Sequence, residues 1–353
     1  MRLPLFGRNG PLLLVLALPL VSCDYPSGTS EPVQPVPLIP LNELLGSSYL
    51  GLEGGLYPGG VDDVPPRQDS VGLQRGNQVQ PLGLTGNPSP SGKYVLLSIG
   101  MGEATQDFCS GPSTPPCNPW SFMGQAAQDT TVNHTTLVIV NGARDKEEAS
   151  HWEATTSTNY DRIRDSLLTP SGLSELQVQA VWIQVSNAIP KGSLPGPGSD
   201  AEILAGRLGN IVRALRARYG NIRQVFLSSR IYADYAQGLL FREPFAYETG
   251  FGVKALLTAQ IVQMSQSGGP VSVVTGNVNY DTVAPWLAWG PYTWADGATP
   301  RGDGLTWERT DFEANGADPS QSGETKVADM LLAFFKQSPY TRCWFLKSAP
   351  VCA

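Results

Sequence analysis

Apolar and β-branched residues gather in five short runs along the middle of the chain. Each run is nearly continuous, as in a strand that is buried on both faces of a parallel sheet. The runs are YVLLSIG (94–100), TTLVIVNG (135–142), VQAVWIQV (178–185), RQVFLSS (223–229) and VSVVTG (271–276). The pattern therefore predicts five parallel strands.

Helical spacing of apolar residues occurs between and after these runs. In residues 200–220 they recur every three or four positions, between an aspartate placed to cap the start and a glycine placed to end the helix. Further helices are predicted over 252–266 and 322–337. Strands that alternate with helices imply an α/β fold, a three-layer α/β/α sandwich whose ligands bind beyond the carboxyl ends of the strands.

Residues 1–23 have the pattern of an export signal. Two arginines precede the apolar run PLLLVLALPLV (11–21), which is too short to span a bilayer stably. The run ends in LVSC, which resembles the bacterial lipobox, where the cysteine is acylated and becomes the first residue of the mature protein. That residue is Cys23. The alternative is an ordinary secretory peptide cleaved near Ser22. Both interpretations export the protein, and the first anchors it to a membrane of the bacterial cell envelope.

Export places the four remaining cysteines in an oxidising compartment, where disulfides persist. Three pairings are possible. We favour Cys109 with Cys117 and Cys343 with Cys352, because each pair closes a short local loop. Metal ligation is the competing interpretation, but the chain has no CxxC motif and neither histidine lies near these cysteines in the sequence. We therefore expect no metal and no other cofactor.

Composition sets further limits on partners and domains. The formal charge is −7 and there is no basic tract, so nucleic acid is not an expected partner. Residues 24–48 are rich in proline and poor in charge, as in a semi-rigid tether between an anchor and a folded body. We expect an irregular lead-in over 49–92, the α/β domain over 93–338 and a disulfide-containing tail over 339–353.

The segment NGADPSQSGETKVADMLLAFF (315–335) resembles the last block of the SGNH (GDSL-type) hydrolases. In that family a DGxHPSxxG turn leads into the C-terminal helix, and here Pro319, Ser320 and Gly323 keep the spacing. The resemblance covers most of residues 49–338. It implies a flavodoxin-like sheet and, in the family, acyl transfer by a serine, a histidine and an aspartate, with a glycine amide and an asparagine as oxyanion donors.

Carried onto this chain, the resemblance keeps the oxyanion donors and loses the catalytic triad. Gly142 in IVNGA takes the glycine position, and Asn187 in QVSNAIP takes the asparagine position. Gly102 in SIGMGEA stands at the nucleophile position, Asn315 at that of the orienting aspartate and Asp318 at that of the base. All three triad positions therefore depart from the family pattern.

Neighbouring residues offer no good replacement for the triad. Ser98 lies inside its strand, and Ser110 follows a cysteine of an expected disulfide. His134 opens the second strand, at the opposite edge from the site, whereas His151 follows the loop after that strand and is better placed to approach the cleft. A carboxylate of ordinary pKa is a poor base toward serine, so Asp318 does not substitute for a histidine. The catalysis usual for this family is not expected.

Acidic residues leave a second mechanism open. Asp303, Asp311 and Glu313 crowd the segment before Asp318, and Glu103 begins the segment after the first strand. Two carboxylates that flank a bond are the usual machinery of glycoside hydrolysis. Loop acids are more commonly solvated or capping residues, and their spacing in the sequence does not give their separation in space.

The stretch APWLAWGPYTWADG (284–297) concentrates aromatic residues after the last predicted strand. Their faces could stack on sugar rings or apolar ligands, and the alternative is a structural loop that covers the end of the sheet. The expected ligand pocket comprises Gly102, Gly142, Asn187, Asp318, Trp289 and Trp294.

The sequence thus predicts a lipid-anchored envelope protein with an SGNH hydrolase-like scaffold and a non-catalytic binding or structural-assembly role. Its partner would be a glycan, an acylated envelope polymer or a neighbouring envelope protein. The alternative is an active esterase, or a carbohydrate deacetylase or hydrolase, with a non-standard nucleophile or a carboxylate pair. That alternative needs His151 or two carboxylates within hydrogen-bond reach of a serine or a bound water.

Overall fold

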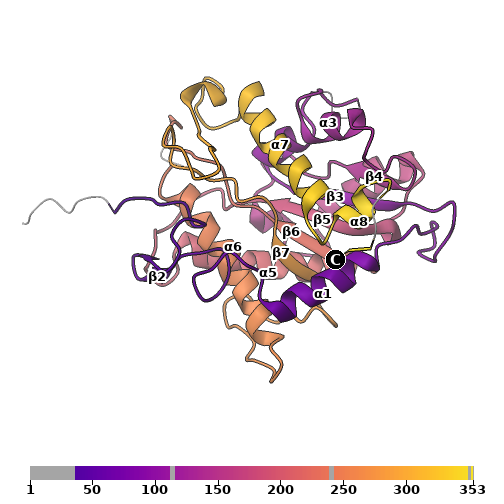
Figure 1. The fold of residues 1–353 in the computed structure, drawn as a ribbon, viewed down its shortest axis with the longest axis horizontal. Coiled ribbons are helices and arrows are strands. Elements are labelled where there is room, and N and C mark those ends of the chain that lie inside the picture. Colours follow the sequence, from indigo (N-terminus) through magenta and orange to yellow (C-terminus); the bar gives the residue numbers. More distant parts are fainter. Residues whose placement is uncertain (1–35, 112–115, 238–241, 349–350, 353) are drawn as a thin grey trace, which may run out of the picture. The chain divides into compact units, whose positions relative to one another are not determined.

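A five-stranded parallel sheet forms the centre of the protein in the computed structural model, which describes residues 36–111, 116–237, 242–348 and 351–352 (Figure 1). Residues from Pro37 onward form one packed unit. The predicted signal segment with Cys23, and residues 24–35 of the predicted tether, lie outside the described residues. Within the described part of the chain, no helix has the length and apolar character needed to cross a membrane.

The order of the strands matches the predicted fold class. The strands are β1 (Ser48–Tyr49), β2 (Leu52–Glu53), β3 (Tyr94–Gly100), β4 (Leu137–Val140), β5 (Val178–Gln184), β6 (Gln224–Leu227) and β7 (Trp286–Trp289). The large sheet has the order β4-β3-β5-β6-β7, and every neighbouring pair is parallel. Numbered along the chain, this order is 2-1-3-4-5, that of flavodoxin-like sheets. The prediction of a five-stranded parallel, flavodoxin-like sheet is therefore confirmed.

Four of the five predicted strands are correct, and the fifth was assigned to the wrong segment. Residues 271–276 form a turn closed by a single bridge between Ser272 and Gly276, and Val273 is fully exposed. The fifth strand is instead β7, the sequence WLAW, which is entirely buried and pairs with β6. The β-branched run VSVV has the higher strand propensity, but burial against neighbouring elements decides which segment pairs.

Helices cover both faces of the sheet, which confirms the three-layer sandwich. The helices are α1 (Pro66–Asn77), α2 (Gly102–Phe108), α3 (Phe122–Gln128), α4 (Thr158–Arg162), α5 (Asp200–Arg218), α6 (Phe245–Gln263), α7 (Gln321–Gln337) and α8 (Arg342–Phe345). Alternate residues of β3 point to opposite faces. Leu97 packs in one core with α5 and α6, and Leu96 packs in the other with α2, α3 and α7.

The folded body begins earlier than the boundary predicted at residue 49. Leu41 is fully buried and Leu44 is 5% exposed, so both belong to the core beside α5 and α6. The lead-in also contains helix α1, which packs along the edge of the sheet at β7 and contacts α8. The lead-in therefore covers an edge strand that would otherwise present unpaired backbone groups.

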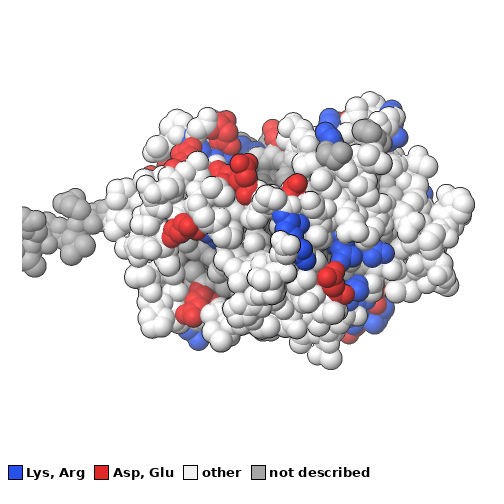
Figure 2. Space-filling view, turned by 60° about the horizontal axis from the view of Figure 1, so that its bottom comes forward, with Lys and Arg blue, Asp and Glu red and all other residues white. Residues whose placement is uncertain are grey.

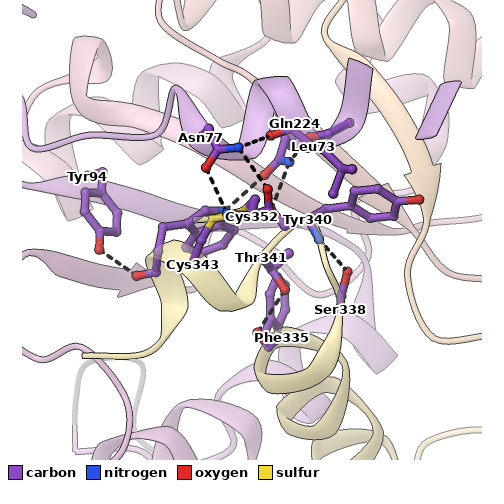
Figure 3. Close-up of a disulfide and its surroundings, with 12 residues drawn as sticks. Leu73, Asn77, Tyr94, Gln224, Phe335, Ser338, Tyr340, Thr341, Cys343 and Cys352 are labelled. Carbon is purple, nitrogen blue, oxygen red and sulfur yellow. Dashed lines mark hydrogen bonds between the residues drawn. A yellow bond between two sulfur atoms is a disulfide. The ribbon is translucent and has the colours of Figure 1, made fainter. Parts of the chain in front are cut away.

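Both favoured disulfides are present in the structure. Cys109 pairs with Cys117, and Cys343 pairs with Cys352. The second bond lies beside α1, where the side-chain amide of Asn77 donates to the carbonyl of Cys352 at 3.0 Å and accepts from its amide at 2.8 Å (Figure 3). The tail is thus fastened both within itself and to the lead-in.

The surface carries few charges, as the composition predicts. On the face shown in Figure 2, basic and acidic side chains form small groups of both signs, separated by wide areas of uncharged residues. This face offers no extended basic patch of the kind that recognises nucleic acid backbones.

Candidate functional site

A cleft of about 270 Å³ opens at the carboxyl ends of the parallel strands, where ligands bind in such sheets. Its walls come from the segments after β3, β4, β5 and β6 of the large sheet and from the turn before α7. The wall residues are Met101, Gly102, Glu103, Asp145, Lys146, Glu148, Ala188, Arg230, Ala317 and Asp318. These walls combine carboxylates with two cationic side chains.

Gly102 and Asp318 face each other in this cleft, although they lie far apart in the sequence. A Cβ placed on Gly102 would stand 3.8 Å from Oδ1 of Asp318 and 3.1 Å from Oδ1 of Asp145. The other carboxylate oxygen of Asp318 accepts a hydrogen bond of 2.7 Å from the side-chain amide of Asn315. Gly102 and Asp318 therefore lie on the walls of the cleft, and Asn315 holds Asp318 from outside them. Asp145 joins the walls from the loop after β4.

The amide of Gly142 is not directed into this cleft. It donates to Oγ of Ser98 at 3.1 Å, and the amide of Ala143 donates to the same oxygen at 3.3 Å. The Ser98 hydroxyl in turn donates to Oδ1 of Asn141 at 2.7 Å. Ser98 is fully buried, so it is neither an exposed nucleophile nor a group that a ligand could displace easily. The amide of Gly142, which was expected to be an oxyanion donor, is thus bonded to an internal hydroxyl, and Gly142 is not among the described wall residues.

The side chain of Asn187 is also bonded to partners inside the protein. Its side-chain nitrogen donates to both the carbonyl and the carboxylate of Asp200, each at 3.1 Å, and its oxygen accepts from Arg207 at 2.9 Å. Burial is the main cause that raises the pKa of Asp200. Asp200 therefore holds Asn187, while Ser199 supplies the side-chain cap of α5 that was expected of Asp200. Asn187 fastens the end of β5 to α5 and does not line the cleft.

A buried ion pair forms part of the cleft wall. The guanidinium of Arg230, after β6, contacts Oε1 of Glu103, on α2, through two nitrogens, with Nε at 3.0 Å. Their side chains are only 6% and 7% exposed. A charge pair this deep needs close geometry to offset its desolvation, and removing one partner leaves an uncompensated charge. The pair therefore fixes the first turn of α2 against the end of β6.

A second carboxyl lies behind this pair, one turn further along α2. Asp107 is fully buried, and neither of its carboxylate oxygens has a hydrogen-bond partner among the described residues. Burial raises its pKa well above the ordinary value, and the nearby charges of Glu103 and Glu324 add to the effect. Burial likewise raises the pKa of Glu324, which accepts a hydrogen bond from Trp120 at 2.6 Å. Burial thus disfavours the charged form of the Asp107 carboxyl.

Neither histidine takes part in the cleft. His134 is exposed at the edge of the sheet, where its ring contacts the carbonyl of Asp129. His151 is also exposed, and its Nδ1 lies 2.9 Å from Oε2 of Glu147. Ser110 accepts a hydrogen bond from Asn118 at 3.1 Å and does not line the cleft. Within the described residues, the walls of the cleft contain no serine, cysteine or histidine.

The tryptophans expected in the pocket are structural. Trp289 belongs to strand β7, and its indole nitrogen donates to the carbonyl of Leu56 in the lead-in at 2.7 Å. Trp294 is fully buried, and its indole nitrogen donates to Glu243 at 2.9 Å. Trp307 is buried beneath the same loop. The stretch therefore covers the end of the sheet, the alternative considered for it, and presents no aromatic surface to the cleft.

The acidic segment before Asp318 also has a structural role. Asp303 pairs with Arg301, and Asp311 is buried against Lys326 of α7 at 2.5 Å. Glu313 is exposed and, like Asp303 and Asp311, lies outside the cleft. Of that segment, only Asp318 reaches the site.

Sequence reasoning missed several wall residues, above all Asp145, Lys146, Glu148 and Arg230. A signal for them was present, because RDKEE (144–148) and the arginine of SSR (228–230) come a few residues after the apolar runs of two strands. Charged residues at such positions gather at one edge of a parallel sheet. Lys146 also has a φ of 64°, a left-handed conformation that costs a residue other than glycine about 1 kcal/mol.

Comparison with known proteins adds little to this description. No family model matches the chain, and no curated protein does. Among solved structures, a salicylyl-acyltransferase from a tetracycline biosynthetic pathway is 13% identical with a TM-score of 0.33, over 69% of this chain and 54% of that one. The match thus spans about half of the acyltransferase.

Two further structures match at a similar level. A carbohydrate esterase of family 2 with a carbohydrate-binding domain, from Corynascus thermopiles (Myceliophthora fergusii), is 14% identical over 69% of this chain and 67% of that one, with a TM-score of 0.34. An extracellular lipase from Streptomyces rimosus is 11% identical over 68% and 99%, with a TM-score of 0.30. Likenesses this weak carry no argument about function. Within the described residues, no cluster of His, Cys, Asp or Glu is arranged to hold a metal ion.

Proposed function

We propose that this protein is a lipid-anchored component of the bacterial cell envelope that uses an SGNH hydrolase-like scaffold to bind a ligand rather than to hydrolyse an ester. One observation carries the proposal. The cleft at the strand ends has no serine, threonine, cysteine or histidine among its described wall residues. Acyl transfer of the serine type requires such a nucleophile together with a base within hydrogen-bond reach.

The hydrogen bonds around the cleft support the same proposal. The amide of Gly142 and the side chain of Asn187, which correspond to the oxyanion donors of the family, are both held by internal partners. An oxyanion hole stabilises charge only if its donors already point to where that charge develops. The geometry therefore does not favour an esterase that has merely exchanged its nucleophile.

The charges of the cleft indicate which ligands suit it. Glu103 is paired with Arg230 and Glu148 with Arg207, whereas Asp145 lines the cleft with its Oδ1 beside Gly102. Oδ1 of Asp318 likewise faces the cleft across Gly102. Two carboxylates in this arrangement accept hydrogen bonds from hydroxyl or ammonium groups. A sugar unit of an envelope glycan offers several such groups, and we place it first among the partners.

The test compares hydrolysis and binding in one series of proteins. We expect the wild type to hydrolyse short aryl esters and acetylated sugars no faster than buffer, and to bind envelope glycan fragments in calorimetric titrations. Asp145→Asn and Asp318→Asn should each weaken binding about tenfold, the typical loss of a charged hydrogen bond. Exposed Glu313→Gln, outside the cleft, serves as the matched control.

Two outcomes would contradict the proposal. Ester turnover by the wild type at an enzyme-like rate, of the order of 1 s⁻¹ or more, would show that a nucleophile has been overlooked. Release of new reducing ends from the glycans, abolished by Asp145→Asn, would instead favour a carboxylate pair as the functional group.

A separate variant tests the assignment of the triad positions. The triple variant Gly102→Ser, Asn315→Asp, Asp318→His would support that assignment if it gains ester turnover.

A further inference from the structure

A second cavity lies on another part of the protein, between α5 and α6, the two helices that lie side by side on one face of the sheet (Figure 1). Its volume is about 520 Å³, within the range of small-molecule pockets. Nothing in the proposed function uses it. We call it the helix groove, and its described walls include Ala201 and Ala205 of α5 and Ala255 and Ala259 of α6.

Small side chains give the helix groove its shape. On each helix the two alanines stand four residues apart, so they lie one above the other on the same face. The groove therefore extends along both helices for at least one turn, as a trough rather than a round hollow. The loop after α6 closes one end, where a Cβ on Gly209 of α5 would stand 2.1 Å from the carbonyl oxygen of Thr275. Only glycine allows the loop to lie this close to α5.

The two ends of the helix groove differ in polarity. Glu53, Glu202 and Lys254 line the end at the first turn of α5 and the middle of α6, and Val262 and Val274 line the other end. The ammonium of Lys254 is already bonded to the carboxylate of Glu53 at 3.2 Å and to two backbone carbonyls. The polar end thus has two carboxylates and one ammonium group, and that ammonium group is already hydrogen-bonded within the protein. The end therefore carries an excess of negative charge, which is complementary to a positively charged group.

Apolar residues continue outward from the apolar end. In the closing loop Val273 is fully exposed and Val271 is 50% exposed, and Val262 on α6 is also exposed. Contiguous exposed apolar residues beside an apolar cavity mark an interaction surface rather than ordinary surface scatter. A trough with a carboxylate end and an apolar end matches a molecule that has an ammonium headgroup and a linear hydrocarbon tail.

The proposed anchor places such molecules within reach. Thirteen residues lie between Cys23 and Pro37, the start of the packed unit, so the extended chain can reach at most roughly 50 Å from one to the other. We propose that the helix groove holds one acyl chain of a zwitterionic, phosphatidylethanolamine-type lipid of the anchoring membrane, with Val271 and Val273 against the lipid surface. This inference rests on the envelope location in the proposed function, and on no property of the cleft.

The experiment uses the mature chain from residue 23 with Cys23→Ser, which removes the acylation site. Its flotation is measured with vesicles of phosphatidylcholine mixed with phosphatidylethanolamine or with phosphatidylglycerol. We expect stronger binding to the ethanolamine vesicles, because the carboxylate end attracts their ammonium groups. Val273→Asp and Ala255→Trp should each reduce that binding by about tenfold or more, the first by placing a charge at the lipid contact and the second by filling the trough.

Controls keep the outcomes distinct. Ala255 and Val273 are exposed, so both variants should keep the melting temperature of the parent chain. Exposed Leu84→Asp, outside the groove, should bind vesicles as the parent does. Asp318→Asn should also bind normally, which separates failure of this inference from failure of the cleft proposal.

Three results would overturn the inference. They are absence of vesicle binding by the parent chain, preference for the glycerol headgroup, and full binding by Ala255→Trp. The last would show that the loop meets lipid while the trough stays empty.

Discussion

At the scale of single residues, the site is decided by what each polar group is bonded to rather than by which residue type is present. Gly142 and Asn187 are the residue types that the family resemblance requires, yet Ser98 and Asp200 hold their donors inside the protein. The sequence shows each of these residues but not the pairing. Hydrogen-bond partners 13 or 44 positions apart are brought together only by the packed strands and helices.

The buried pair of Arg230 and Glu103 leads to a prediction at this scale. Arg230→Met should lower the free energy of unfolding by about 3–5 kcal/mol, because Glu103 is left charged and buried. Combining it with Glu103→Leu should restore more than half of that loss. Urea denaturation of the two variants and the wild type measures the difference. A double variant as unstable as the single one would mean that the pair does not act as a unit.

At the scale of elements, periodicity predicted the three longest helices and four of the five strands of the large sheet, but it did not identify the edge strand β7. The helices predicted at 200–220 and 322–337 are present as α5 and α7, because their apolar faces were long and regular. The strand predicted at 271–276 is a turn, and WLAW took its place. A four-residue run gives too little pattern to distinguish a strand from a loop.

The tail and α1 supply a prediction at this scale. Removing the second disulfide with Cys343→Ser and Cys352→Ser should cost about 2–3 kcal/mol, the loop-closure value for a ring of this size. Asn77→Ala, which removes two hydrogen bonds to Cys352, should cost about 1–2 kcal/mol. The variant with all three substitutions should lose less stability than the sum of the separate losses, because the disulfide and the Asn77 hydrogen bonds hold the same end of the chain. Strictly additive losses in urea denaturation would contradict this shared role.

At the scale of the whole molecule, burial disfavours the charged form of several carboxyl groups. Burial raises the pKa of Glu243 and of Glu248, at the start of α6, to about 7. Asp129 shows the opposite effect, because its hydrogen bond with Lys336 lowers its pKa to about 2. The two kinds of group make stability depend on pH in opposite directions.

The sign of the pH dependence follows directly. The glutamates bind a proton more tightly in the folded state, so their contribution is present below about pH 4.5 and is lost as the pH rises through about 7. Asp129 contributes above about pH 4 and loses its contribution as the pH falls toward 2. Stability should therefore be greatest near pH 4–5 and decline toward pH 8, by at most about 1.4 kcal/mol per pH unit for each glutamate.

The double variant Glu243→Gln, Glu248→Gln tests this pH dependence. In this variant the free energy of unfolding, measured in urea at each pH, should decline less between pH 5 and pH 8 than in the wild type. Exposed Glu313→Gln should leave the decline unchanged. If the double variant declines as steeply as the wild type, other groups cause the effect.

The sequence by itself determined the class of the fold, four of the five strands of the parallel sheet, the three longest helices and the favoured disulfides. It could do so because these depend on local periodicity and on short loops. It also located one edge of the sheet as the place of the cleft, and it named Gly102 and Asp318, which the structure brings together. Only the tertiary structure decided that Arg230 and Asp145 complete the walls, and that the tryptophans are internal. The helix groove likewise exists only in three dimensions, because it depends on which faces of two packed helices carry small residues.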